Sequence, residues 1–242
     1  MKKLPAQPVN GLIDGLEVLQ ELAVSRGPVS CKALSEKLNI ELTRMNRILK
    51  TLDYLGIAYR TQDRKYKSGP GIHVLAIQSM LGSGLLSKAL PVLESLQKYG
   101  HIVALGVLWK DTVSYLYHHE PGTSSYEAIG RLSLYPATQS SIGMALLSEK
   151  ENDEIEELYS GKIIPGYTAP YKNIKALIEE IEEIRQQGYA VLTSKGVNSI
   201  AVKLGNPAYA SIAISGKINP NEVKKYVSIL NEASGKIHAE HE

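Results

Sequence analysis

Three polar side chains near the start of one predicted helix have the chemistry needed to contact nucleobases. The stretch LTRMNRILKTLDYL, residues 42–55, repeats leucine, isoleucine and methionine at the spacing of a buried helix face. Arg44, Asn46 and Arg47 stand between these apolar residues. Arginine can donate two hydrogen bonds to guanine, and asparagine can pair with adenine. These residue types predict a helix that reads DNA bases, although a merely solvated polar face would produce the same pattern.

Further basic residues follow this helix and suit the phosphate backbone of a nucleic acid. The segment that follows predicts two brief strands, 57–59 and 65–67, around the polar turn Gln62-Asp63-Arg64. Phosphates attract lysine and arginine without regard to base sequence. We therefore expect further DNA contacts from Thr43 and Lys50 in the helix, and from Arg60, Arg64, Lys65 and Lys67 in the hairpin.

Two shorter helices are predicted to hold the reading helix in place. An apolar stripe over residues 11–25 ends at Arg26-Gly27-Pro28, and Ser30 is the expected N-cap of the next helix, CKALSEKL. The reading helix then follows after a very short connection. Helix, helix, turn, helix and basic hairpin is the order of a winged helix-turn-helix, whose second motif helix enters the major groove.

The charge of the chain is distributed unevenly. Residues 1–70 hold 12 lysines and arginines against 7 acidic residues, whereas the remainder holds 15 against 18. The small net charge of +2 therefore conceals a basic N-terminal third. A basic region joined to a slightly acidic body predicts that the first part meets an anionic partner and that the rest has another task.

The remaining residues predict a linker helix and an antiparallel-rich α+β domain. Apolar residues over 70–86 indicate the linker helix, with Gly82 and Gly84 at its end, and Pro91 begins or breaks a short helix at 90–99. IVALGVLW and TVSYLYHH, joined by Lys110-Asp111, indicate a β-hairpin. Further helices are expected at 136–148, 151–159 and 174–187 and after Asn219, with strands at 189–193, 199–203 and 209–215.

Metal binding and catalysis find little support in the residue pattern. His118 and His119 are adjacent, and neighbouring side chains of a strand point to opposite faces, so we expect no shared metal ion. The sequence contains no Gly-x-Ser-x-Gly motif, phosphate loop or dinucleotide-binding turn. The one cysteine, Cys31, is expected to pack in a helix. We therefore expect a non-enzymatic protein without a cofactor.

A cytoplasmic location without a membrane partner is expected from the apolar pattern. Two lysines near the N-terminus are not followed by the apolar segment of a signal peptide. No apolar run approaches the roughly 18 residues needed to span a bilayer. A single cysteine, which allows no intrachain disulfide, fits a reducing compartment.

The chain resembles transcriptional regulators of the IclR family over nearly all of its length. In the N-terminal part, the resemblance lies in GLEVLQELA, in ALSEKLNIELTRMNRILKTLDYLGIAYR and in YKSGPGIHVLA. In the C-terminal part, it lies in LPVLESLQ, PATQSSIGMALLS, GYAVLTSKGVNSIAV and YASIAISG. The order and spacing of these segments carry the resemblance, rather than any one of them.

The resemblance implies a winged helix-turn-helix at 1–69, a linker helix at 70–87 and, at 88–242, an effector-binding α+β domain of the GAF/PAS type with a mostly antiparallel sheet. Members of the family commonly dimerise, often form tetramers, and bind small organic acids as effectors while repressing or activating operons. By similarity, the effector pocket of this chain involves Ser141, Ile142, Thr193, Ser199 and Ser215.

Two functions from different classes remain open at this point. The first is a ligand-responsive regulator, most simply a repressor, that binds a palindromic operator in double-stranded DNA as a homodimer or a dimer of dimers. The second is a small-molecule sensor or interaction module whose basic helices contact a protein or RNA. A preference of the purified protein for palindromic over mixed duplex DNA separates the two.

Overall fold

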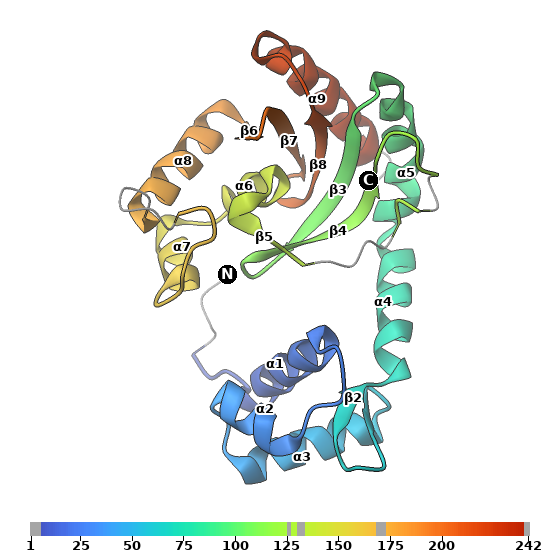
Figure 1. Ribbon diagram of the computed structural model, residues 1–242, viewed down its shortest axis with the longest axis vertical. Coiled ribbons are helices and arrows are strands. Elements are labelled where there is room, and N and C mark those ends of the chain that lie inside the picture. The colour runs from blue at the N-terminus through green and yellow to red at the C-terminus, as the bar shows by residue number, and fades with distance from the viewer. Residues whose placement is uncertain (1–5, 125–126, 130–133, 168–172, 240–242) are drawn as a thin grey trace. The chain divides into compact units, whose positions relative to one another are not determined.

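The computed structural model describes residues 6–124, 127–129, 134–167 and 173–239 (Figure 1). The outer limits of the predicted domains, residues 1 and 242, lie outside these described residues. The chain divides into two compact units, Lys2–Ser83 and Gly84–Glu242. Each unit has its own hydrophobic core.

The first unit has the predicted order of three helices and a hairpin. Its elements are α1 (Asn10–Val24), α2 (Cys31–Leu38), α3 (Leu42–Tyr54), β1 (Ala58–Arg60) and β2 (Tyr66–Ser68). The two strands begin one residue later than predicted and pair antiparallel. A winged helix-turn-helix is therefore confirmed as the fold of this unit.

Local capping explains where the helices of the first unit begin and end. The Ser30 hydroxyl accepts the backbone N–H of Ala33 at 3.1 Å, which confirms its predicted N-cap role. Asn39 ends α2 in the left-handed conformation, a backbone region that asparagine tolerates better than most residues. The connection to α3 is therefore only a few residues long. Val18, Leu34, Met45 and Leu49 then join the three helices in one buried cluster.

The segment after the hairpin forms two helices whose bounds differ from the prediction. Helix α4 covers Pro70–Ser83, and α5 covers Leu85–Leu96 with Pro91 in its interior. Gly84 separates them at a φ of 64°, a conformation that glycine adopts without a steric penalty. The prediction that Pro91 begins or breaks α5 was wrong, because burial of Leu85 and Ala89 holds the turns that precede it.

A six-stranded antiparallel sheet forms the centre of the second unit, with the strand order β5-β4-β3-β8-β7-β6. Its strands are β3 (Ile102–Trp109), β4 (Thr112–His119), β5 (Tyr135–Pro136), β6 (Tyr189–Ser194), β7 (Val197–Gly205) and β8 (Ala208–Gly216). The predicted hairpin at Lys110-Asp111 and the three predicted later strands are thus present.

Helices cover both faces of the sheet (Figure 1). Helices α5 and α9 (Val223–Ala239) pack on one face, and α6 (Ser141–Leu147), α7 (Asn152–Tyr159) and α8 (Ile174–Gln187) on the other. Short 3-10 turns at Gln97–Tyr99, Ala137–Gln139 and Pro220–Glu222 precede or follow these helices.

Side-chain size differs between the two sheet faces. Large residues such as Ile200 and Ile212 face α5 and α9, whereas the alanines Ala104, Ala201 and Ala213 face α6. Small side chains let α6 approach the sheet closely. Its first turn is thereby held against the ends of the central strands, where the candidate cavity lies.

Candidate functional site

Helix α3 presents one polar face away from the core of its unit. Met45 and Leu49 are fully buried, whereas the side chains of Thr43, Arg47 and Lys50 are exposed. At about 100° per helical residue, those three lie together on the side opposite the buried pair. The other predicted DNA contacts, Arg44, Asn46, Arg60, Arg64, Lys65 and Lys67, are exposed as well.

The trio predicted to contact bases does not share one direction. Arg44 and Asn46 are two residues apart, which places them about 160° apart around the helix axis. Arg47 lies on the outer face between them. Tyr54, which is 89% exposed at the end of α3, falls on the same outer face and was missed by the sequence reasoning. Tyr54 is seven residues, or about two helical turns, after Arg47, and this spacing could have indicated that the two share a face.

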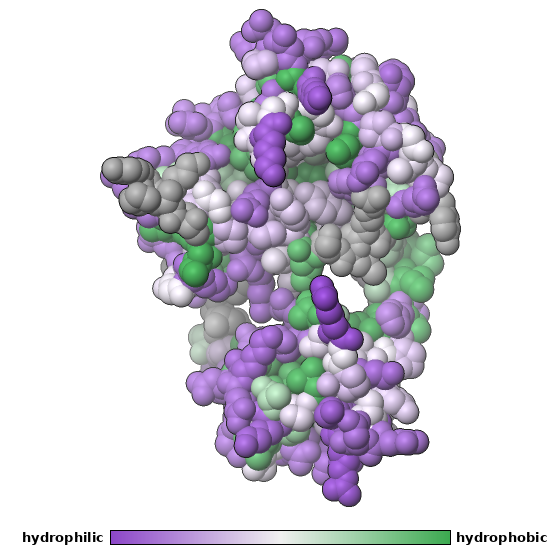
Figure 2. All heavy atoms as spheres, viewed as in Figure 1, coloured by the Kyte–Doolittle hydropathy of each residue, from purple (hydrophilic) through white to green (hydrophobic). Residues whose placement is uncertain are grey.

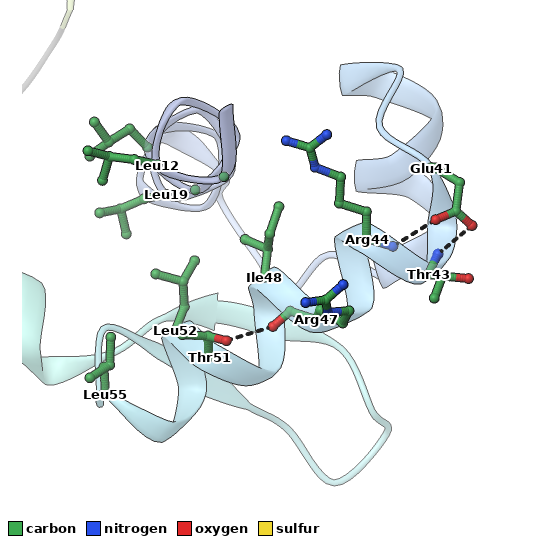
Figure 3. A pocket seen from close by; sticks show the side chains of 13 residues that line it. Leu12, Leu19, Glu41, Thr43, Arg44, Arg47, Ile48, Thr51, Leu52 and Leu55 are labelled. Carbon is green, nitrogen blue, oxygen red and sulfur yellow. Dashed lines mark hydrogen bonds between the residues drawn. The ribbon is translucent and has the colours of Figure 1, made fainter. Parts of the chain in front are cut away.

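Arg44 is paired with a residue of α1 while its side chain stays partly exposed. Its Nε lies 2.6 Å from Oδ2 of Asp14, and the two side chains are 45% and 18% exposed. Figure 3 shows Arg44 extending from α3 toward α1. Glu41 caps the same end of α3, because its carboxylate accepts the backbone N–H groups of Thr43 and Arg44 at 2.8 and 2.9 Å. These backbone hydrogen bonds hold the pKa of Glu41 below its usual value.

The hairpin places its basic side chains around a well-defined turn. Arg64 occupies the tip in the left-handed conformation, at a φ of 62°. Lys65 forms an ion pair with Asp63 at 2.9 Å, which offsets part of its charge. The cations of Arg60 and Lys67 lie over the rings of Tyr66 and Tyr59, at 5.9 and 5.3 Å from the ring centroids.

An apolar groove of about 630 Å³ separates α1 from α3 (Figure 3). Leucines and isoleucine form its floor, and the polar parts of Arg44 and Arg47 lie at its rim. Several exposed apolar residues lie along the same unit, on α1 and α4; they are Leu12, Leu16, Val74, Leu75, Ile77 and Leu81. Figure 2 shows hydrophobic side chains reaching the surface over α4.

A cavity of about 400 Å³ opens in the second unit at the start of α6. Three serines meet there: the hydroxyl of Ser199 lies 2.7 Å from that of Ser141 and accepts a hydrogen bond from Ser215. A smaller cavity of about 70 Å³ continues behind them and is lined by Ile142. Four of the five predicted effector residues are thus brought together.

The fifth predicted residue, Thr193, lies on the other face of the sheet. Its hydroxyl donates to Oδ1 of Asn198 at 2.6 Å, and the amide of Asn198 donates to the carbonyl of Ile218. Because neighbouring residues of β6 alternate between faces, Leu192 and Ser194 line the cavity in its place. The assignment of Thr193 to the cavity is therefore corrected to Ser194.

Two cavity residues on β4 were not predicted because a β-bulge changes the alternation of that strand. Residues Leu105 and Gly106 pair with Tyr117 and Tyr115, so Leu116 is left out of the ladder. The bulge brings Tyr115 and His118 to the same face, with ring centroids 5.5 Å apart. The Tyr115 hydroxyl lies 2.9 Å from that of Ser140, and burial raises the pKa of Tyr115. Gln139 and Tyr135 complete this side of the cavity.

The two adjacent histidines have separate environments. His118 lines the cavity, whereas His119 stacks on Tyr117 and donates from Nε2 to the carbonyl of Thr123 at 3.0 Å. Among the residues that the structure describes, no three His, Cys, Asp or Glu side chains are grouped to hold a metal ion. No helix within the described ranges has the length and apolar character to cross a membrane.

Comparison with known proteins gives one consistent result. Residues 78–239 match the family described as "Bacterial transcriptional regulator IclR C-terminal". The probable transcriptional regulator SauR of Cupriavidus necator is 24% identical over 213 residues, which cover 85% of this chain and 84% of SauR.

Two solved structures illustrate the shared fold. A putative IclR transcriptional regulator of Silicibacter sp. matches with a TM-score of 0.77 at 18% identity, over 96% of both chains. An IclR homologue of Microbacterium hydrocarbonoxydans in complex with 4-hydroxybenzoate matches with a TM-score of 0.63 at 21% identity, over 95% of this chain and 98% of that one.

Proposed function

Because the chain belongs to the IclR family of bacterial transcriptional regulators, we propose that it is a sequence-specific DNA-binding repressor controlled by a small organic acid. The observation that carries the proposal is the outer face of α3, where Thr43, Arg47 and Lys50 are exposed on a helix anchored by buried apolar residues. A helix of this kind fits the major groove, and Arg47 is the residue placed to contact a base edge.

The hairpin supplies the phosphate contacts of the proposed complex. Its turn is fixed by the Thr61 hydroxyl, which accepts the backbone N–H of Lys65 at 3.1 Å. Because the turn is already ordered, it presents Arg64 at its tip and does not have to become ordered when DNA binds. Such contacts add affinity for any duplex and weaken as salt concentration rises.

A second copy of the chain is the proposed partner of the exposed apolar residues. Within the part of the chain that the structure describes, α4 buries none of its residues, and α1 exposes Leu12 and Leu16. Large exposed apolar side chains gathered on one unit often mark interaction sites. We propose a homodimer, alone or as a dimer of dimers, whose two-fold symmetry selects a palindromic operator.

The cavity of the second unit is the proposed effector site. Its volume lies within the range of small-molecule pockets, about 300–1,000 Å³. Ser141, Ser199 and Ser215 offer hydroxyls on one wall, and Tyr115 and His118 offer polar groups on another. This set suits the carboxylate and hydroxyl groups of a small organic acid such as the 4-hydroxybenzoate bound by the Microbacterium relative.

The effector acts by favouring one arrangement of the dimer over another. A ligand shifts such an equilibrium only by its difference in affinity for the two arrangements. Gly84, between α4 and α5, joins the two units and is the proposed position of the adjustment. Repression follows if the arrangement without effector binds the operator and keeps polymerase from the same DNA. The proposal involves no catalytic step and locates the protein with the bacterial chromosome in the cytoplasm.

Fluorescence anisotropy with duplexes from the region upstream of its own gene tests the proposal. We expect tight binding to one palindromic duplex and much weaker binding to mixed-sequence DNA at moderate salt. Addition of 4-hydroxybenzoate, or of another acid that raises the melting temperature, should change the operator affinity. Equal and weak binding to every duplex contradicts the assignment.

A further inference from the structure

We propose that Asp14 is a specificity-determining residue of the DNA-binding unit, because it withholds the charge of Arg44 from phosphates and leaves Arg44 for base recognition. This inference rests on the DNA binding proposed above. The starting observation is the ion pair between α1 and the first turn of α3, in which Nε of Arg44 lies 2.6 Å from Oδ2 of Asp14.

The pair uses only one of the donor groups of Arg44. A guanidinium carries five N–H donors, and the ion-pair contact through Nε leaves the two terminal Nη groups available. The Arg44 side chain remains 45% exposed, whereas Asp14 is 18% exposed. The carboxylate therefore fixes the direction of the arginine from its inner side. The free end keeps the geometry for two hydrogen bonds to the O6 and N7 atoms of guanine.

The start of α3 is also unfavourable for a phosphate. Helix N-termini generally attract phosphates through free backbone N–H groups. Here Glu41 already accepts the N–H groups of Thr43 and Arg44. Glu41 thus occupies the backbone N–H groups at the start of α3, and Asp14 pairs with the guanidinium of Arg44. A phosphate brought to this point would meet net negative charge, whereas a base edge would meet fixed donors.

Arg47 and Lys50 are the cations of α3 with which Arg44 is compared. Both are exposed on the outer face of α3, and neither is a member of the ion pairs found around Arg44 and Lys65. Each such cation that neutralises a phosphate adds about 0.9 to the slope of log K against log salt concentration. An arginine whose charge is offset by Asp14 adds little to this slope, so Asp14 lowers affinity for non-specific DNA while the operator contact is kept.

The test compares Asp14→Asn with Glu232→Gln in the full chain. Glu232 pairs with Lys236 at 2.7 Å on α9, so its replacement changes the net charge equally but in the other unit. Anisotropy titrations with operator and mixed-sequence duplexes are run over a series of salt concentrations. Asp14→Asn should tighten binding to the mixed duplex, steepen its salt slope by about 0.9 and lower the ratio of operator to mixed affinity. Glu232→Gln should leave all three unchanged.

Arg44→Ala supplies the second measurement. It should lower the operator-to-mixed ratio but leave the salt slope on mixed DNA unchanged. Asp14→Asn should no longer steepen that slope when it is added to Arg44→Ala. The inference is overturned if Arg44→Ala reduces that slope by about one unit, since Arg44 then already holds a phosphate. An unchanged slope and ratio in a normally folded Asp14→Asn variant overturns it as well. If Asp14→Asn lowers the melting temperature strongly, the test rests on Arg44→Ala alone, through its operator-to-mixed affinity ratio and its salt slope on mixed DNA.

The wild-type titration separates this inference from the function on which it rests. If the wild-type protein prefers no duplex, the proposed function fails. If it prefers an operator but the Asp14→Asn and Arg44→Ala variants behave like Glu232→Gln, only the role of Asp14 fails.

Discussion

The basic surface of the first unit and the cavity of the second unit differ in how far apart in the chain their residues lie. The basic face extends over residues 43–67, on one helix and the hairpin that follows it. The cavity joins Tyr115 on β4, Ser141 on α6, Ser199 on β7 and Ser215 on β8. The first is an exposed, charged surface, and the second is a cavity lined by hydroxyls and aromatic rings.

This difference shows where each site is sensitive to change. A charged side chain on a solvated helix can be replaced without disturbing the core beneath it. A cavity made by strand register and by the close approach of α6 changes whenever one of its supports moves. Substitutions on the basic face should therefore alter binding with little effect on folding, whereas supports of the cavity should alter both.

The largest contrast is expected from two glycine substitutions. A Cβ atom on Gly143 of α6 would lie 2.2 Å from the carbonyl oxygen of Ala137, so Gly143→Ala must displace backbone. We expect a loss of about 3 kcal/mol in the free energy of unfolding. Gly15→Ala on α1 meets nothing within 4 Å and should stabilise by up to about 1 kcal/mol, because alanine favours helix. Thermal unfolding measures the stability of both variants. Equal changes in stability would mean that the packing of Gly143 against Ala137 is no tighter than the surroundings of Gly15.

A smaller effect, on binding alone, is expected at the outer face of α3. Arg47→Ala should cost about 1–3 kcal/mol of discrimination at one operator position, since a base contact is lost. Lys50→Ala should weaken binding to all duplexes alike and lower the salt slope by about 0.9. Titrations with operator variants carrying single base changes distinguish the two. If Arg47→Ala binds every variant as the wild-type protein does, Arg47 does not read a base.

The sequence predicted the first site largely because its geometry is local. Met45 and Leu49 of the apolar repeat define the buried side of α3, and helical spacing then gives the exposed side. Leu42 and Leu55, at the two ends of the predicted stripe, are exposed instead. The direction of Arg44 could not be obtained in this way. Its partner, Asp14, belongs to a different helix, and only the packing of α1 against α3 brings the two together.

The second site was predicted less completely. Which face of the sheet a strand residue occupies depends on how the strands pair, and these strands are far apart in the chain. The resemblance to the IclR family predicted an effector pocket with Ser141, Ser199 and Ser215, and these three residues line one cavity. It also included Thr193, whose neighbour Ser194 faces the cavity instead. Tyr115 and His118 were not predicted as cavity residues, because an unbroken alternation along the strand would put them on opposite faces. No residue type in the sequence indicates the bulge at Leu116.

Neighbouring positions on opposite sheet faces give the third prediction. Ser199 is the centre of the serine cluster. If the proposed effector is an organic acid, Ser199→Ala should weaken its binding by about 1 kcal/mol through loss of a hydrogen-bonding group, with 4-hydroxybenzoate as the first acid to be titrated. Thr193→Val removes a hydroxyl from the other face and should leave the affinity unchanged. Isothermal titration calorimetry of both variants is the measurement. A loss in Thr193→Val and none in Ser199→Ala would reverse the orientation assigned to β6 and β7.

The smallest expected effect concerns a tyrosine that lines the cavity. Burial raises the pKa of Tyr115 above its value in the unfolded chain, which is about 10. The folded state therefore holds the phenolic proton more tightly, and the stability gained is fully present below pH 10 and lost as the pH rises through the folded pKa.

Tyr115→Phe should accordingly flatten the alkaline fall in melting temperature. Tyr54→Phe, at the 89% exposed position on α3, controls for the removal of a tyrosine hydroxyl. Thermal unfolding from pH 8 to pH 11 compares the two variants with the wild-type protein. An equal alkaline fall in all three would mean that the Tyr115 ring is as accessible to water as Tyr54, and that the cavity wall formed by the bulged strand is open in solution.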